Sequence, residues 1–161
     1  MPPLRNMMSA GRPPPLTSFV RPHTHMEISV HDNVLISYEV LSEKREIHLR
    51  TKHSGPKTIE HTDIIFRGVE GYYFFHDNFQ TIIFDVTEIS VESILEDDKA
   101  RFEEGWRYCW PGAWNESSEA ARRAYLTERG VSGFSLSSSF GMSGWILANS
   151  MERVLKDERT A

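Results

Sequence analysis

The segment from residue 62 to residue 88 constrains the fold most, because no other part of the chain is as rich in β-branched and aromatic residues. The tripeptide His76-Asp77-Asn78, whose side chains tolerate turns, divides it into two apolar arms. The first arm contains Ile64, Ile65, Phe66, Val69, Tyr72, Tyr73, Phe74 and Phe75, and the second contains Thr81, Ile82, Ile83, Phe84 and Val86. We expect a hairpin, or two strands with a longer loop, in the middle of an antiparallel sheet. Alternation along the second arm predicts that Phe84 is a core residue.

Four further segments have the alternation or composition of strands, namely residues 34–40, 47–51, 134–140 and 145–148. Together with the two arms they predict about six strands. In the segment 134–140 the serines occupy every second position, which is typical of a solvated strand face. Residues 151–155 either extend the last strand or begin a short helix.

The pattern changes to a helical period after residue 88. Val91, Leu95, Phe102 and Trp106 are spaced by 4, 7 and 4 residues, so we expect them on one helix face, with Trp106 in the core. This helix begins at Ser93, where Glu96 completes a capping box, or at Ser90. Pro111 and Gly112 end it.

A second helix begins near Asn115, a good N-cap, and Gly130 is predicted to follow its C-terminus. The fold class is therefore α+β. We predict a single domain with an antiparallel sheet of about six strands, with or without strong curvature, and two helices inserted before the last two strands.

Residues 1–25 differ from the rest because they hold six of the eight prolines. Such a composition predicts a flexible N-terminal tail, followed by one α+β domain over residues 26–161. Met26 is an alternative natural start, because the patterned sequence begins at Glu27.

Charge and composition disfavour several classes of protein. The net charge is −5, from 18 basic and 23 acidic residues, and there is no basic run, so we expect no nucleic-acid partner. The sequence contains no run of 18 apolar residues, so we expect no membrane span. The single cysteine, Cys109, excludes an internal disulfide and favours a cytoplasmic protein, and we expect it to be a small buried hydrophobe.

Motifs for catalysis, cofactors and metals are absent from the sequence. The seven histidines lack the spacing of a metal site, and there is neither a nucleophile elbow nor a glycine-rich phosphate loop. We therefore expect no metal and no cofactor. His76 beside Asp77 is the best polar cluster, either as a general base with its orienting carboxylate or as ordinary turn residues.

The most unusual segment is residues 106–114, which hold three of the four tryptophans. Trp110 and Trp114 are either core residues or anchors on a binding surface, and Arg107 lies between them and Trp106. The acidic segment 92–104 has six acidic and two basic residues.

These features predict a non-enzymatic binding protein. It would dock a protein partner, or a second copy of the chain, through the aromatic loop and the acidic helix. The alternative is a small-molecule binder or hydrolase that uses His76 and Asp77 in a pocket between sheet and helices.

Overall fold

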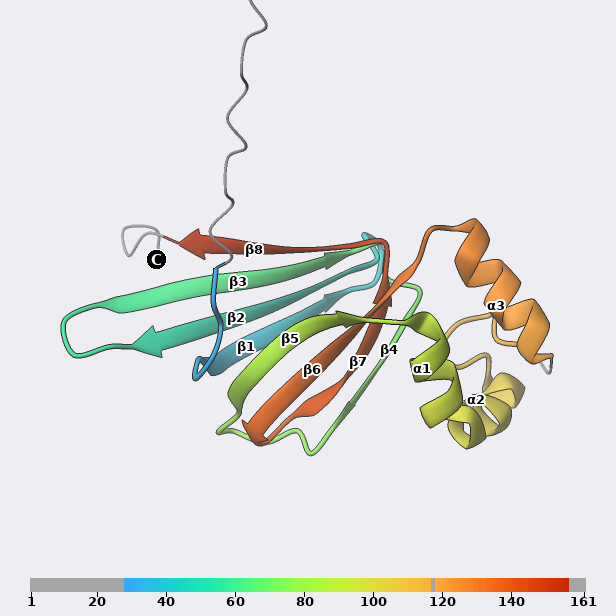
Figure 1. Ribbon diagram of the computed structural model, residues 1–161, viewed down its shortest axis with the longest axis horizontal. Coiled ribbons are helices and arrows are strands. Elements are labelled where there is room, and N and C mark those ends of the chain that lie inside the picture. The colour runs from blue at the N-terminus through green and yellow to red at the C-terminus, as the bar shows by residue number, and fades with distance from the viewer. Residues whose placement is uncertain (1–27, 117, 157–161) are drawn as a thin grey trace, which may run out of the picture.

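The computed structural model describes residues 28–116 and 118–156, which form one antiparallel sheet with helices at one end (Figure 1). The strands are β1 (Val34–Leu41), β2 (Glu46–Ser54), β3 (Ile59–Arg67), β4 (Gly71–Phe75), β5 (Ile82–Ile89), β6 (Ser132–Phe140), β7 (Ser143–Ala148) and β8 (Ser150–Lys156). The helices are α1 (Val91–Asp97), α2 (Lys99–Gly105), the 3₁₀-helix η1 (Trp106–Tyr108) and α3 (Glu119–Glu128).

The α+β class and the antiparallel sheet are confirmed, but the strand count is wrong. The described residues form eight strands rather than six, and three of them, not two, follow the helices. The predicted N-terminal tail lies outside the described residues. The longest α-helix in the described part, α3, has 10 residues, well below the roughly 20 that a membrane span requires.

The hairpin predicted for residues 62–88 does not form. The strand order is β4-β7-β6-β5-β1-β2-β3-β8, so β3 and β4 lie near opposite edges although only three residues separate them. Gly68, with φ +64°, turns the chain between them. His76-Asp77-Asn78 therefore links two strands that are not neighbours, while β5 is central as expected.

The sheet curves so that its inner face encloses one hydrophobic core. Strands β1 and β5 share a single ladder pair, Val34 with Ile82, so the two halves of the sheet are free to bend towards each other there. Inner-face side chains from both halves meet in this core, together with Val30 from the segment before β1. Its buried members are Val30, Ile47, Leu49, Ile64, Phe66, Ile83, Val86, Phe134, Leu136, Met142, Ile146 and Ala148.

A second core lies on the outer face of the sheet, where the helices pack (Figure 1). Trp145 and Leu147 of β7 point into this core, while Ile146 and Ala148 point into the inner one. Strand β7 is apolar on both faces for this reason. The buried members of the second core are Ile94, Leu95, Phe102, Trp114, Leu126, Val131, Trp145 and Leu147.

Phe84 is not a core residue, although the alternation of side chains along β5 predicts that it is. The register between β5 and β6 shifts on both sides of Ile83, which marks β-bulges. The extra residues reverse the alternation, so that Ile83 and Val86 are fully buried and Phe84 is 53% exposed.

The first predicted helix is divided in two. Ser90 caps α1 by accepting a hydrogen bond from the Ser93 amide at 3.0 Å, so the earlier of the two predicted starts is confirmed. A break at Asp98 then redirects the chain into α2 and η1. Trp106 consequently leaves the buried face and is 44% exposed, which contradicts its predicted place in the core.

The second predicted helix, α3, begins later than expected and ends where predicted. Its N-cap is Ser118, whereas Asn115 is buried and donates to the backbone oxygens of Phe102 and Trp110. Gly130 has φ +62°, as expected for the residue after a helix C-terminus.

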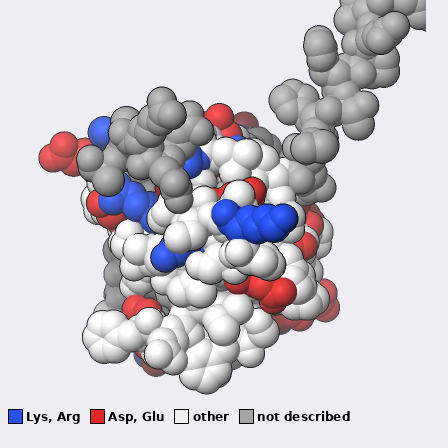
Figure 2. All heavy atoms as spheres, turned by 90° about the vertical axis from the view of Figure 1, so that its left-hand side faces the viewer, with Lys and Arg blue, Asp and Glu red and all other residues white. Residues whose placement is uncertain are grey.

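At the end of the sheet farthest from the helices, the lower part of the face in Figure 2 is largely uncharged, and Lys and Arg side chains lie above it. Val34, Ile82 and Phe140 are ladder partners across β1, β5 and β6, so their side chains lie in a row on one face. Phe140 is 52% exposed, and Phe79 in the link before β5 is fully exposed.

Candidate functional site

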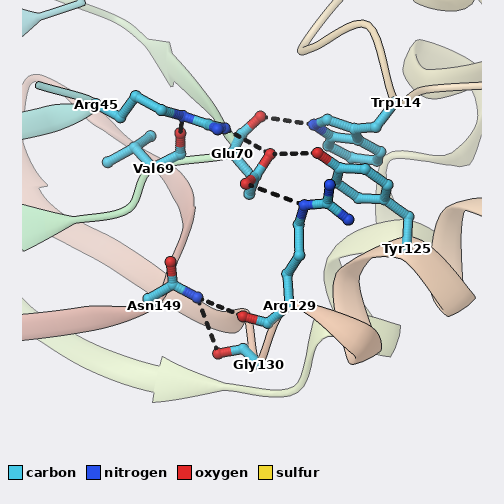
Figure 3. Close-up of polar contacts among 8 residues, drawn as sticks. All are labelled: Arg45, Val69, Glu70, Trp114, Tyr125, Arg129, Gly130 and Asn149. Atoms are coloured by element: carbon cyan, nitrogen blue, oxygen red, sulfur yellow. Dashed lines mark hydrogen bonds and ion pairs between the residues drawn. The ribbon is translucent and has the colours of Figure 1, made fainter. Parts of the chain in front are cut away.

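A buried carboxylate, Glu70, lies at the centre of a polar cluster between the sheet and the helices (Figure 3). Its side chain is only 5% exposed. Arg45 Nη2 lies 2.6 Å from Glu70 Oε2, and the Tyr125 hydroxyl donates to the same oxygen at 3.2 Å. Arg129 Nε lies 4.0 Å from Oε1. Two guanidinium groups thus share one carboxylate.

Backbone contacts fix Glu70 in this position. Its amide donates to the carbonyl of Leu147, and its carbonyl accepts the indole N–H of Trp114, both at 2.8 Å. The next residue must be small, because a Cβ on Gly71 would lie 2.8 Å from Pro111. The link between β3 and β4 is therefore held against both β7 and the aromatic loop.

The two arginines reach Glu70 from different elements. Arg45 lies in the turn between β1 and β2 with φ +54°, and its Nε donates to the Val69 carbonyl at 3.1 Å. Arg129 follows α3, and its guanidinium lies 3.8 Å from the centre of the Tyr125 ring. The Asn149 side chain donates to the Arg129 carbonyl at 2.6 Å (Figure 3), which ties the end of α3 to the link between β7 and β8.

A cleft of about 360 Å³ opens beside this cluster. Its lining residues come from the end of β1, the start of β2, the link before β4, the aromatic loop and α3. They are Val40, Leu41, Ser42, Arg45, Glu46, Ile47, Val69, Glu70, Gly71, Tyr72, Pro111, Gly112, Ala113, Trp114 and Tyr125. Val40 pairs with Ile47 and shares its inner face, yet it is 39% exposed because the core is uncovered at this mouth.

The aromatic segment is partly buried and partly exposed. Trp114 is buried and stacks on Tyr125, with ring centres 5.7 Å apart and planes 12° apart. Trp110 is half-buried and packs against Phe102 and Trp145 at 5.8 and 5.9 Å. Both rings therefore belong to the packing between helices and sheet, and their role in binding stays a prediction.

The residues just before Trp110 are exposed. Tyr108 is 78% exposed, and Arg107 is also exposed. Cys109 is exposed with φ +55°, so the prediction that it is buried is wrong. A hollow of about 290 Å³ lies beside Tyr108. It is lined by Tyr73, Arg101, Glu104, Gly105, Tyr108 and Trp110.

The acidic segment is distributed over α1 and α2. Part of its charge is neutralised locally, since Arg101 pairs with Asp98 at 3.4 Å and Arg123 with Glu92 at 3.8 Å. Lys99 lies 3.9 Å from carboxylates of both Glu103 and Glu119. Within residues 28–116 and 118–156, no ion pair involves the remaining three acidic groups, Glu96, Asp97 and Glu104.

His76 and Asp77 lie on the exposed link between β4 and β5, away from the Glu70 cleft. His76 has φ +55°, as turn chemistry predicts for this link. Asp77 Oδ2 accepts a hydrogen bond from the Tyr38 hydroxyl at 2.9 Å, and this bond raises the pKa of Tyr38 above its usual 10.0. No hydrogen bond or ion pair joins His76 to Asp77 among the described contacts.

The described part of the chain contains no group of three or more His, Cys, Asp or Glu residues arranged to hold a metal ion. His23 and His25 lie outside it.

Sequence reasoning missed Glu70 and its partners. One signal was present, because Glu70 is the only acid in a Gly-Val-Glu-Gly segment between two apolar strands. Its partners Arg45, Tyr125 and Arg129 are distant in the chain and carry no local pattern. Comparison of the chain with family models, curated proteins and solved structures found no match.

Proposed function

We propose that this chain is a non-enzymatic protein-binding domain that docks a basic segment of a partner on its helical end. The docking surface consists of Trp106 and Tyr108 on η1 and the carboxylates Glu96, Asp97 and Glu104 on α1 and α2. The observation that carries the proposal is the exposure of two large aromatic side chains on η1, one of which, Tyr108, lines a hollow together with Glu104, an acidic group without an ion-pair partner among the described residues.

The aromatic part of this surface is rigidly supported. A Cβ on Gly105 would lie 2.6 Å from the Trp110 ring, so the backbone that leads into η1 packs directly on that indole. Trp110 in turn packs on Phe102 and Trp145. A rigid aromatic anchor loses little conformational entropy on binding, which favours affinity.

The charge of the surface indicates the kind of partner. Aromatic side chains supply contact area and cation–π acceptors, and unpaired carboxylates attract lysine and arginine. A partner segment with both basic and apolar side chains satisfies both requirements. Because the carboxylates are exposed, their contribution should appear mainly in the association rate and should weaken with salt.

Selection from a displayed random-peptide library on the immobilised protein tests the proposal. We expect the enriched peptides to combine Lys or Arg with an aromatic or aliphatic residue. Titration of one such peptide should show that Trp106→Ala or Tyr108→Ala weakens binding by about thirtyfold or more, the loss expected for an anchor side chain.

Phe140→Ala provides the matched control. Phe140 is about as exposed as Trp106, but it is the last residue of β6, and this strand ends away from the helices (Figure 1). This variant should bind the peptide unchanged. The proposal is wrong if the selected peptides lack basic residues, or if Trp106→Ala and Tyr108→Ala bind as well as the unsubstituted protein.

A further inference from the structure

We propose that the cleft beside Glu70 binds a small monocarboxylate with an apolar body. This site is separate from the docking surface and does not depend on the proposed function. The inference rests on two properties of the cleft: a free hydrogen-bond donor and an uncovered apolar wall.

The charged groups around the cleft are three arginines and three glutamates. Glu70 is the single carboxylate between the guanidinium groups of Arg45 and Arg129. Glu46 also lines the cleft, and its carboxylate lies 2.8 Å from the His48 ring and 3.6 Å from Arg67. Arg67 pairs more closely with Glu152, at 2.7 Å. The charges of these groups therefore balance, so the choice of a carboxylate over an amine rests on the free donor of Arg45.

Arg45 is the group that would contact such a ligand. It lines the cleft, and its side chain is 51% exposed. Its Nε donates to Val69 and its Nη2 pairs with Glu70. No described hydrogen bond uses Nη1, so this end of the guanidinium is free to donate to a carboxylate.

Apolar side chains form part of the lining of the cleft. Val40 lies on the inner face but is not covered, and Tyr72, Pro111 and Trp114 continue the wall. At about 360 Å³ the cleft is at the small end of the range for ligand pockets. A ligand with one ring or a short aliphatic chain would cover Val40 while its carboxylate meets Arg45.

Isothermal titration with matched probes tests the ligand class. Phenylacetate supplies the carboxylate, phenylacetamide its neutral counterpart and phenethylamine the opposite charge. We expect phenylacetate to bind at least about tenfold more tightly than phenylacetamide, because a charge-assisted hydrogen bond is lost in the amide. Phenethylamine should not bind.

Two variants assign the binding to this cleft. Val40→Trp fills the mouth without removing a charge and should abolish phenylacetate binding. Arg50→Gln, which removes an equally exposed arginine from the same strand as the cleft residue Ile47, should leave it unchanged. Peptide binding at the docking surface should persist in Val40→Trp, so the two proposals can fail separately.

The proposal is overturned if phenylacetamide binds as tightly as phenylacetate, if Val40→Trp retains phenylacetate binding, or if phenylacetate does not bind at millimolar concentration.

Discussion

Replacing Glu70 by glutamine should destabilise the protein, because Glu70 is the one buried carboxylate among the described residues. Glutamine has nearly the same size and keeps one acceptor oxygen, so the substitution isolates the charge. It removes the ion pair with Arg45 and weakens the hydrogen bond from Tyr125, and it places an amide beside a guanidinium. Among the described residues, Arg45 and Arg129 form no other ion pair.

The expected magnitude lies between two limits. Breaking a fully buried ion pair costs about 3–5 kcal/mol, whereas a surface pair contributes about 0–1 kcal/mol. Glu70 is 5% exposed, but Arg45 is 51% exposed and can be rehydrated. We therefore expect the free energy of unfolding to fall by about 2–3 kcal/mol, part of it from the charged hydrogen bond of Tyr125.

Urea denaturation followed by tryptophan fluorescence measures this loss. With a slope typical of small domains, the midpoint should fall by about 1–2 M without a change in slope. Glu39→Gln is the control, since Glu39 is 45% exposed and its pair with Arg50 is 3.5 Å long. That variant should stay within about 0.5 kcal/mol. A Glu70→Gln midpoint equal to that of Glu39→Gln would refute the reasoning.

Three further predictions follow from particular contacts. Ile83→Ala should cost about 2–5 kcal/mol of unfolding free energy and Phe84→Ala less than about 1 kcal/mol, because the bulges bury the first and expose the second; equal urea midpoints would contradict this. Asp77→Asn should lower the pKa of Tyr38 towards 10.0 in a titration of phenolate absorbance. Because the pKa of Tyr38 is higher in the folded state than in the unfolded state, the stability from this hydrogen bond is present below pH 10.0 and is lost as the pH rises through the folded pKa. The Asp77→Asn variant should lack this loss of stability at high pH. Gly105→Ala should cost about 1–3 kcal/mol and shift the tryptophan emission, since its Cβ would lie 2.6 Å from an indole ring; an unchanged emission spectrum would show that the ring does not pack there.

Features that a few neighbouring residues determine could be predicted from the sequence. The cap at Ser90 depends on a hydroxyl and an amide three residues away, and Gly130 follows α3 because its left-handed backbone is easiest for glycine. The serine face of β6 was also visible, since Ser135 and Ser137 are more exposed than Phe134 and Leu136. These signals established the α+β class.

Strand pairing could not be predicted, because each strand selects its neighbours through distant contacts. The first apolar arm looked continuous, but the turn at Gly68 directs β3 and β4 to different neighbours. The prediction that Phe84 is a core residue was wrong for a related reason. A bulge places two residues of one strand opposite one residue of its partner, so it depends on both strands. The sequence of β5 alone shows only regular alternation.

The candidate site was visible only in part. The aromatic segment was conspicuous, but which rings are exposed depends on the break at Asp98, which turns Trp106 outwards. Glu70 was hidden because a carboxylate in a short link resembles an ordinary loop residue. Glu70 stands out only through its contacts with Arg45, Tyr125 and Arg129, which lie far apart in the sequence and meet in the folded chain.

The separation of β3 from β4 also affects the order in which the chain can fold during synthesis. Strand β4 pairs only with β7, and β3 gains its second neighbour only from β8. Until residues 143–156 have been made, β4 therefore has no neighbour and β3 has one unpaired edge. During this interval the exposed edges can pair with other nascent chains, so we expect aggregation during synthesis to depend on how fast the C-terminal strands emerge.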